Sequence, residues 1–365
     1  MIAASHPVQR PADARVMTLD ASGAIAHRAR RDFPALLRRG DLLVANDAAT
    51  LPASLHGRHA SSGAPVEVRI AARASIAPGA IERVTAIVFG SGDYRTRTED
   101  RPLPPALEPG DRLELGPLVA RVEAVLGHPR LVALRFEGTP AAIWSGIARH
   151  GRPVQYAHVP EPLQMWDVWT PIAGAPVALE APSAGFAIDW RTLAELREHG
   201  IGFVTLTHAA GLSSTGDAAL DTLLPLDEPY EIPAVTARAI AAARRRGGRI
   251  VAVGTTVVRA LEHAASRDGR VRAGRGVATQ RLGAQSCLRV VDAMLTGTHE
   301  PGTSHHALLQ AFADEAALHR ADDELERAGY RTHEFGDSVL IEEQRAKACG
   351  CDKVSRWHPS SPSPR

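Results

Sequence analysis

The fold of this chain is decided by one segment, Arg249-Ile250-Val251-Ala252-Val253-Gly254-Thr255-Thr256-Val257-Val258-Arg259-Ala260-Leu261-Glu262. Its apolar start, Ile250 to Val253, is rich in β-branched residues and predicts a short strand that is covered on both faces. Gly254 allows a sharp turn, and Thr255 or Thr256 can cap the helix that follows. The segment therefore predicts a strand, a tight turn and a helix whose first N–H groups point beyond the strand end.

Two charged residues of the predicted helix suggest chemistry at this junction. Arg259 lies about one turn into the helix, where its guanidinium could form a fork with a carboxylate or a phosphate. Glu262, three residues later, can pair with Arg259 on the same face. The spacing by itself favours an ordinary capped helix with a surface Arg–Glu pair.

The charge composition bounds the possible partners. With 42 basic and 41 acidic residues the formal net charge is +1, so an RNA partner would need a local basic patch. Arginines gather in two places, at Arg28, Arg30, Arg31, Arg38 and Arg39, and at Arg244, Arg245 and Arg246. Either cluster is equally typical of a solvated helix face.

The 365 residues predict about two domains. The absence of an apolar leader and of any run near 18 apolar residues predicts a cytoplasmic protein that does not enter a membrane. Cysteine and histidine spacings show no ligand set, so we expect no metal. A monomer is favoured, although nothing in the sequence fixes the oligomeric state.

The pattern of predicted secondary structure changes twice along the chain. Residues 53–139 contain short alternating segments between Gly, Pro and Ser clusters, which predicts an inserted all-β barrel. Residues 1–52 and 140–345 alternate strand and helix patterns and predict an α/β body. Residues 346–365, rich in Ser and Pro, predict a disordered tail.

Polar residues follow four of the predicted strands of the body. An open α/β sheet binds its ligands outside the carboxyl ends of its strands, so these positions are expected to share one site. They are Asn46 and Asp47, His208, Gly254 to Thr256, and Thr296 to His299.

Seven segments, in the same order along the chain, resemble motifs of the S-adenosylmethionine:tRNA ribosyltransferase-isomerase family of queuosine biosynthesis. Residues 254–262 resemble its GTTxxRxLE motif. The other six are Gly40–Ala53 (GDLLVxNxTxVxPAR), Gly57–Val68 (GRKxSGGKxEVL), Ala181–Phe186 (APTAGLHF), Val204–Gly211 (LTLHVGxG), Leu295–Ser304 (LxTNFHLPxST) and Phe335–Ile341 (YGDAMLI).

The chain also departs from the family pattern in its most chemical motifs. Ala187 stands where APTAGLHF has its histidine, and Gly297-Thr298 replaces the NF pair, although Thr296 and His299 remain. The GTFxPV and DHxMHSE stretches are replaced by residues 212–217 and 226–231. The resemblance thus implies a divergent member, with the family's α/β body and inserted barrel.

The family reaction transfers the ribosyl part of S-adenosylmethionine to the aminomethyl group of a 7-deazaguanine base in tRNA. Adenine and methionine leave, and an epoxycyclopentanediol is formed without a metal or redox cofactor. The sulfonium acidifies the C5′ hydrogens, so the resemblance implies a base, for which His208 and His299 are the candidates. Each could instead be a strand-end histidine with a purely structural role.

The resemblance also implies binding roles. Thr255, Thr256 and Arg259, after Gly254 and with Glu262 as partner, suit the methionine carboxylate or a phosphate in a cleft shared with Ser183. The segment from Pro182 through Ser183 to Gly185 allows a flat purine to approach the backbone closely, or it is only a structural turn. Asn46 and Asp47 are suited to binding ribose hydroxyls or, alternatively, only to capping the end of their strand. Thr296 also follows a predicted strand and belongs to the same candidate site.

Three interpretations of function stay open. The first is the family reaction, with S-adenosylmethionine as co-substrate and tRNA as the acceptor. The second applies the same sulfonium chemistry to a small-molecule acceptor, which the near-neutral charge and altered motifs favour. The third is an inactive relative that only binds RNA or a protein. The loss of the APTAGLHF histidine and of the NF pair favours it, and the retention of Arg259, Glu262, His208 and His299 disfavours it.

Overall fold

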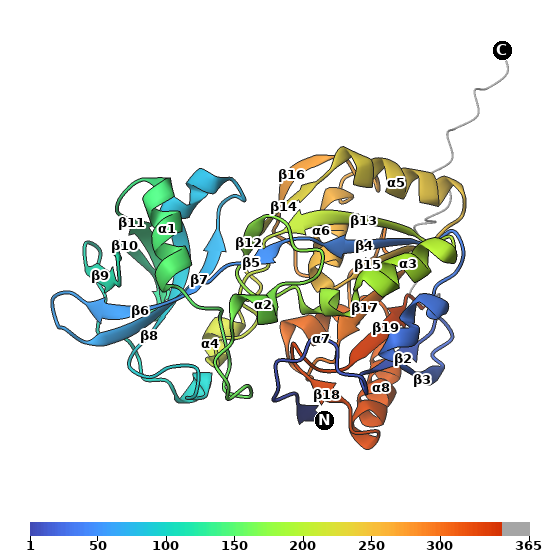
Figure 1. The fold of residues 1–365 in the computed structure, drawn as a ribbon, viewed down its shortest axis with the longest axis horizontal. Coiled ribbons are helices and arrows are strands. Elements are labelled where there is room, and N and C mark those ends of the chain that lie inside the picture. The colour runs from blue at the N-terminus through green and yellow to red at the C-terminus, as the bar shows by residue number, and fades with distance from the viewer. Residues whose placement is uncertain (345–365) are drawn as a thin grey trace, which may run out of the picture.

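Two sheet assemblies lie side by side in the protein, a closed barrel and a larger mixed sheet covered by helices (Figure 1). The computed structural model describes residues 1–344, so the expected tail at 346–365 lies outside the described residues. This architecture confirms the predicted fold class, an α/β body with an inserted all-β barrel.

The body contains a nine-stranded sheet. Its order is β16 (Gly274–Ala278), β14 (Glu228–Ile232), β13 (Gly202–His208), β4 (Leu42–Asn46), β15 (Ile250–Val253), β17 (Ala293–Gly297), β19 (Ser338–Glu342), β2 (Arg15–Leu19) and β3 (Ile25–Ala29). The four central strands β13, β4, β15 and β17 are mutually parallel. Their carboxyl ends therefore lie at the same edge of the sheet.

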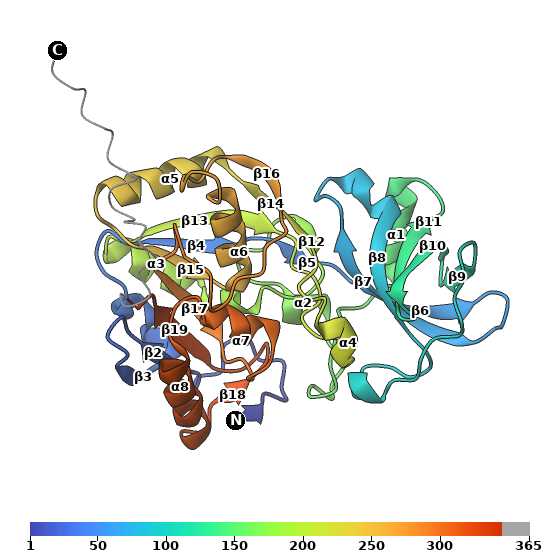
Figure 2. The same cartoon turned by 180° about the vertical axis from the view of Figure 1, so that it is seen from behind.

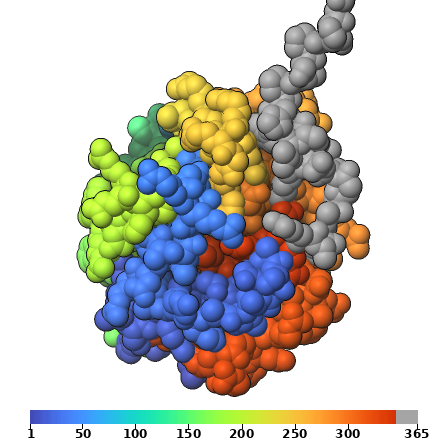
Figure 3. Space-filling model, turned by 90° about the vertical axis from the view of Figure 1, so that its right-hand side faces the viewer, coloured from blue at the N-terminus to red at the C-terminus, as the bar shows by residue number. Residues whose placement is uncertain are grey.

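Both faces of the central strands are buried, as the apolar run in β15 predicted. Ile250 and Ala252 pack into one apolar cluster with α5, α6 and α8, whereas Val251 and Val253 pack into a second with η1 and α3. This alternation is the period of two of a strand. The helices of the body are η1 (Arg30–Leu36), α2 (Met165–Val168), η4 (Ser183–Ala187), α3 (Trp190–Glu198), α4 (Ala218–Asp221), α5 (Ala234–Arg245), α6 (Thr255–Ala264), α7 (Ser304–Leu309) and α8 (Glu315–Arg327). Figure 2 shows α6, α7 and α8 from the side on which they cover the sheet, and Figure 3 shows the end of the body opposite the barrel.

The barrel is a separate closed sheet, as expected, and shares no strand pairing with β4. Its order is β10 (Leu118–His128), β11 (Leu131–Phe136), β8 (Arg83–Phe89), β7 (Pro65–Arg73), β6 (Ser54–His59) and β9 (Arg112–Leu115), with the short helices η2 (Pro78–Glu82) and η3 (Thr98–Asp100). Helix α1 (Pro140–His150) adds Ile143 and Ile147 to the apolar cluster of the barrel. The exact division at residues 52/53 and 139/140 stays a prediction.

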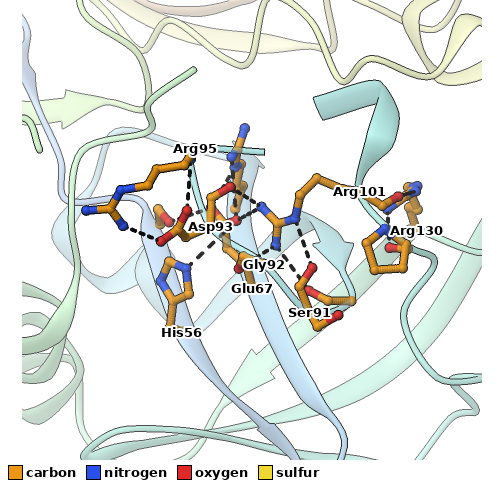
Figure 4. Close-up of polar contacts among 12 residues, drawn as sticks. His56, Glu67, Ser91, Gly92, Asp93, Arg95, Arg101 and Arg130 are labelled. Atoms are coloured by element: carbon orange, nitrogen blue, oxygen red, sulfur yellow. Dashed lines mark hydrogen bonds and ion pairs between the residues drawn. The ribbon is translucent and has the colours of Figure 1, made fainter. Parts of the chain in front are cut away.

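A buried ion network organises one side of the barrel (Figure 4). Glu67, 2% exposed, pairs with the guanidinium groups of Arg69 and Arg101. Burial alone would raise the pKa of Glu67, but the two arginines outweigh burial and lower that pKa to about 2. Arg101 also donates to the backbone carbonyls of Gly90 to Asp93, and so fixes the loop that follows β8.

Two small parallel pairs complete the described chain, β1 (Ile2–Ala3) with β18 (Arg331–Thr332) and β5 (Ala49–Thr50) with β12 (Pro176–Ala178). No helix within residues 1–344 is both long enough and apolar enough to cross a membrane.

Candidate functional site

The strand ends that the sequence singled out meet at one edge of the sheet, as predicted. Asn46 ties them together through its side-chain amide, which donates to the backbone carbonyl of His208 at 2.9 Å and to Thr256 Oγ1 at 3.4 Å. Its amide oxygen accepts the backbone N–H of His208 at 2.9 Å. Asn46 therefore joins the ends of β13 and β4 to the first turn of α6, and both its amide nitrogen and its amide oxygen are hydrogen-bonded.

The turn between β15 and α6 needs glycine. Gly254 has a φ of +90°, a backbone conformation that residues with side chains rarely adopt. Gly254 is also the N-cap of α6, and no side chain caps that helix. The expectation that Thr255 or Thr256 caps the helix was therefore wrong, because both already lie inside its first turn. The uncapped N–H groups at this end remain available to a ligand.

Two connected cavities open at this edge. The first, of about 310 Å³, lies between the β15–α6 turn, the η4 segment and the start of α7. The second, of about 580 Å³, extends toward the barrel and includes Arg97, Thr98 and Glu99 of the barrel loop. The residues that line both cavities are Glu180, Ala181, Ser183, Ser213, Gly297, His299, Thr303 and His305.

The structure brings eight of the thirteen predicted site residues to the first cavity. They are Pro182, Ser183, Gly254, Thr255, Thr256, Arg259, Thr296 and His299. The other five line neither cavity; they are Asn46, Asp47, Gly185, His208 and Glu262.

Arg259 is already paired within the protein. Its guanidinium forms a buried ion pair with Glu228 and donates to the carbonyls of Ala278 and Gln280 at 3.1 and 3.3 Å. Burial lowers the pKa of Arg259 to about 10, so it stays charged at neutral pH. The expected pair with Glu262 was wrong: the Glu262 carboxylate instead accepts the backbone N–H groups of residues 289–291, just before β17.

His208 is completely buried behind the first cavity. Burial and the nearby charge of Arg259 lower its pKa to about 3, so the ring is neutral. Its Nε2 lies 3.4 Å from the Glu228 carboxylate, and neither ring nitrogen has a hydrogen bond within the described part of the chain. In this position His208 lies beside the Arg259–Glu228 pair and does not line either cavity.

His299 and His305 stand at the junction of the two cavities. Their rings lie 4.9 Å apart between centroids, and His299 Nε2 lies 2.7 Å from Thr296 Oγ1. Burial lowers the pKa of His299 well below its usual value, and burial together with the charge of Arg259 lowers that of His305 to about 4. Both imidazoles are therefore neutral at pH 7 and can accept a proton.

Two of the remaining predicted residues have clear structural partners. The Asp47 carboxylate accepts the hydroxyls of Thr205 and Thr207 at 2.6 and 2.7 Å, so it stabilises the strand exit. Gly185 allows close packing, because a Cβ there would lie 3.0 Å from Thr170 Cγ2.

The second cavity contains a ladder of rings. Tyr156 and His158 stack at 6.2 Å and 11°, and His158 and His333 stack at 4.0 Å and 14°. Together with Glu334, these histidines form the one group of side chains within residues 1–344 that could hold a metal ion. However, imidazole lone pairs lie in the ring planes, and two stacked planes do not direct them at one ion. His158 Nε2 is also already bonded to Glu334 at 2.9 Å.

The two arginine clusters lie away from both cavities. Arg38, Arg39 and Arg244 to Arg246 lie next to the first residues of β4 and β15, at the opposite edge of the parallel strands. Arg30 is buried and bonded to the carbonyls of Gln9 and Gly336, and Arg244 is bonded to Asp292. In the barrel loop, the exposed Arg97 lines the second cavity, and the exposed Arg95 lies two residues before it.

Sequence reasoning missed several residues of the cavities, notably Glu180, Ser213, Glu228, Arg281 and His305. Three of them had a signal. Ser213 and Glu228 lie in the segments that replace the GTFxPV and DHxMHSE motifs, and His305-His306 is an adjacent histidine pair. Glu180 is brought to the cavity from a loop, where no periodic pattern marks it.

The family model for queuosine biosynthesis proteins matches residues 1–341. Two similar curated proteins are the S-adenosylmethionine:tRNA ribosyltransferase-isomerases of Sorangium cellulosum and Pelobacter propionicus. They are 34% and 32% identical, and the matches cover 93% of this chain and 94% and 96% of those proteins. A crystal structure of S-adenosylmethionine tRNA ribosyltransferase from Thermotoga maritima is 24% identical, with a TM-score of 0.49 over 93% of this chain and 96% of that one. On the family match and the two curated relatives, this chain belongs to the queuosine biosynthesis protein family.

Proposed function

We propose that this protein is an S-adenosylmethionine:tRNA ribosyltransferase-isomerase that acts in queuosine biosynthesis. The observation that carries the proposal is the pair of connected cavities at the carboxyl ends of β13, β4, β15 and β17. One cavity is formed by the body alone, and the other reaches the barrel. Two adjoining cavities suit a reaction in which two substrates must be bound side by side.

The first cavity is the proposed site of S-adenosylmethionine. The uncapped first turn of α6 presents backbone N–H groups, which suit the methionine carboxylate. The wall formed by Pro182, Ser183 and Ala184 gives the close approach that a flat purine needs. Arg259 also lines this cavity, where the ion pair with Glu228 holds its guanidinium in place.

His299 is the proposed base for the C5′ proton, in preference to His208. It lines both cavities, so it lies between the proposed positions of the two substrates, whereas His208 lines neither. Its hydrogen bond with Thr296 fixes the ring orientation, and its lowered pKa keeps it unprotonated at neutral pH.

The test measures adenine release from S-adenosylmethionine by purified protein in the presence of tRNA that carries 7-aminomethyl-7-deazaguanine. We expect release by the parent and a loss of about 10²- to 10⁴-fold in His299→Ala, with S-adenosylmethionine affinity retained. His319→Ala, a change at an exposed histidine of α8, is the matched control. A parent protein that releases no adenine with this tRNA or with the free base refutes the proposed function.

A second candidate is the same chemistry on a small-molecule acceptor. The observation that favours it is the position of the two arginine clusters, none of whose members lines either cavity; the arginines in the cavity linings are Arg97, Arg259 and Arg281. Adenine release with the free aminomethyl-deazaguanine base, at a rate that equals or exceeds the rate with tRNA, would favour this candidate.

A further inference from the structure

Glu180 occupies the boundary between the two cavities. It lines both of them, as His299 and His305 do, and it comes from the loop after β12. Its carboxylate accepts the hydroxyl of Tyr156, and it accepts the backbone N–H of Ser213 at 3.0 Å. The proposed reaction, as argued so far, assigns no role to this group.

The Glu180 carboxylate has no cationic partner among the described residues. Within residues 1–344, no arginine, lysine or histidine nitrogen lies within 4.0 Å of it, whereas Glu228 and Glu67 are each paired with arginine. Its neighbours are a hydroxyl, an amide and, farther off, the carboxyl of Glu334. A carboxyl that lines a cavity without a counter-charge is suited to a cationic ligand.

Carboxyl groups outnumber guanidinium groups on the wall of the second cavity. The carboxyl groups are those of Glu99, Glu180, Glu300 and Glu334, against the one arginine of the lining, Arg97. This lining disfavours a phosphate and favours an amine. The ring ladder of Tyr156, His158 and His333 adds a flat surface on which a base can stack.

We propose that Glu180 is the acceptor-amine site of this enzyme, where its carboxylate binds the aminomethyl ammonium of the 7-deazaguanine base and takes up its proton. This inference rests on the proposed function, but it holds for the base in tRNA and for the free base.

The proton transfer is what the acceptor needs before it can react. An alkylammonium with a pKa near that of lysine, about 10, has no free lone pair at neutral pH. When an ammonium N–H bond breaks, its electron pair stays on nitrogen as the nucleophilic lone pair, and the proton forms an O–H bond with Glu180. Burial raises the pKa of Glu180 to about 7, against the hydrogen bonds from Tyr156 and Ser213, so this carboxyl can hold the proton near neutral pH.

S-adenosylmethionine also carries two cationic groups, a sulfonium and an α-ammonium, and either of these could be the cation that binds Glu180 instead of the acceptor amine. The position of Glu180 favours the acceptor, because Tyr156 and the ring ladder extend from it into the second cavity. The uncapped turn of α6, proposed for the methionine carboxylate, lies in the first cavity.

The test uses the full-length Glu180→Gln variant, which keeps the shape of the side chain and removes its charge. Glu161→Gln, the same change at an exposed glutamate nearby, is the matched control. Three quantities are measured: the S-adenosylmethionine dissociation constant by calorimetry, kcat/KM for the aminomethyl acceptor by adenine release, and the binding preference for tRNA with the aminomethyl base over identical tRNA with guanine.

We expect Glu180→Gln to lower kcat/KM for the acceptor and the preference for the aminomethyl base by about 10- to 100-fold. The S-adenosylmethionine dissociation constant should change less than twofold, which also shows that the variant is folded. If Glu180→Gln does not fold, Glu180→Asp should keep the preference for the amine while kcat falls.

Two outcomes overturn this inference while the proposed function stands: an active parent whose Glu180→Gln variant keeps acceptor kcat/KM and preference, or a variant that loses S-adenosylmethionine affinity instead. The second outcome would assign Glu180 to the cations of S-adenosylmethionine. A parent without adenine release refutes the proposed function and this inference together.

Discussion

Arg259→Met is predicted to act first on stability, through the partner that it leaves behind. In the parent, the guanidinium of Arg259 and the carboxylate of Glu228 are both buried and paired. Removing one member of a buried ion pair typically costs about 3–5 kcal/mol, because the other charge stays buried without compensation. The variant also withdraws a donor from the carbonyls of Ala278 and Gln280.

Protonation sets a limit to this cost. A carboxyl with an ordinary pKa near 4.3 can be neutralised at pH 7 for about 3.7 kcal/mol, so we expect a loss of about 3–4 kcal/mol there. The folded variant then binds one proton more than its unfolded chain, so its stability must fall as pH rises, by about 1.4 kcal/mol per unit. Lowering the pH from 7 to 5 should therefore reduce the deficit to about 1 kcal/mol. His208, whose Nε2 lies 3.4 Å from Glu228, can carry the same proton.

The assay is urea unfolding at pH 5, 6 and 7 of the parent, Arg259→Met, Glu228→Gln and the double variant. The double variant should lose less stability than the sum of the single variants, because it leaves neither charge unpaired. Arg272→Met, which removes an arginine from the exposed pair with Asp268, is the control and should change little. Additive losses that do not depend on pH, or a fully stable Arg259→Met that only loses S-adenosylmethionine affinity, would refute this reasoning.

Three further predictions follow from other contacts. Glu67→Gln should destabilise the protein by about 3–5 kcal/mol at pH 7 in urea unfolding, since it leaves Arg69 and Arg101 unpaired. The lowered pKa of Glu67 means that its stabilisation is present above about pH 4.5 and is lost as pH falls toward 2, so parent and variant should converge in acid. Glu262→Ala should cost about 1.5–3 kcal/mol of stability through its lost backbone hydrogen bonds, and unchanged S-adenosylmethionine affinity by calorimetry would exclude a ligand contact. If tRNA is the acceptor, Arg95→Ala and Arg97→Ala should each reduce the salt slope of log K by about 0.7–0.9, whereas Arg245→Ala and Arg246→Ala should leave it unchanged; the reverse pattern would move tRNA to the far edge of the sheet.

The sequence by itself determined which strands form the centre of the body and at which edge of the sheet the candidate site would lie. The apolar run from Ile250 to Val253 favoured a strand buried on both faces, and Gly254 favoured the sharp turn after it, which the structure confirms with a positive φ. These are local properties, set by side-chain period and backbone sterics. The convergence of the ends of β13, β4, β15 and β17 then followed from the rule for parallel strands.

Only the tertiary structure decided the partners of the charged residues. Arg259 pairs with Glu228 from β14, 31 positions away, and not with Glu262, three positions away. Spacing along the sequence predicts which side chains can meet on one helix. A buried guanidinium, however, must be paired to offset its desolvation, and tertiary packing decides which carboxylate lies next to it. For the same reason Glu180 had no signal in the sequence, since its proposed role rests on its place at the boundary of two cavities and on the absence of a counter-charge within residues 1–344.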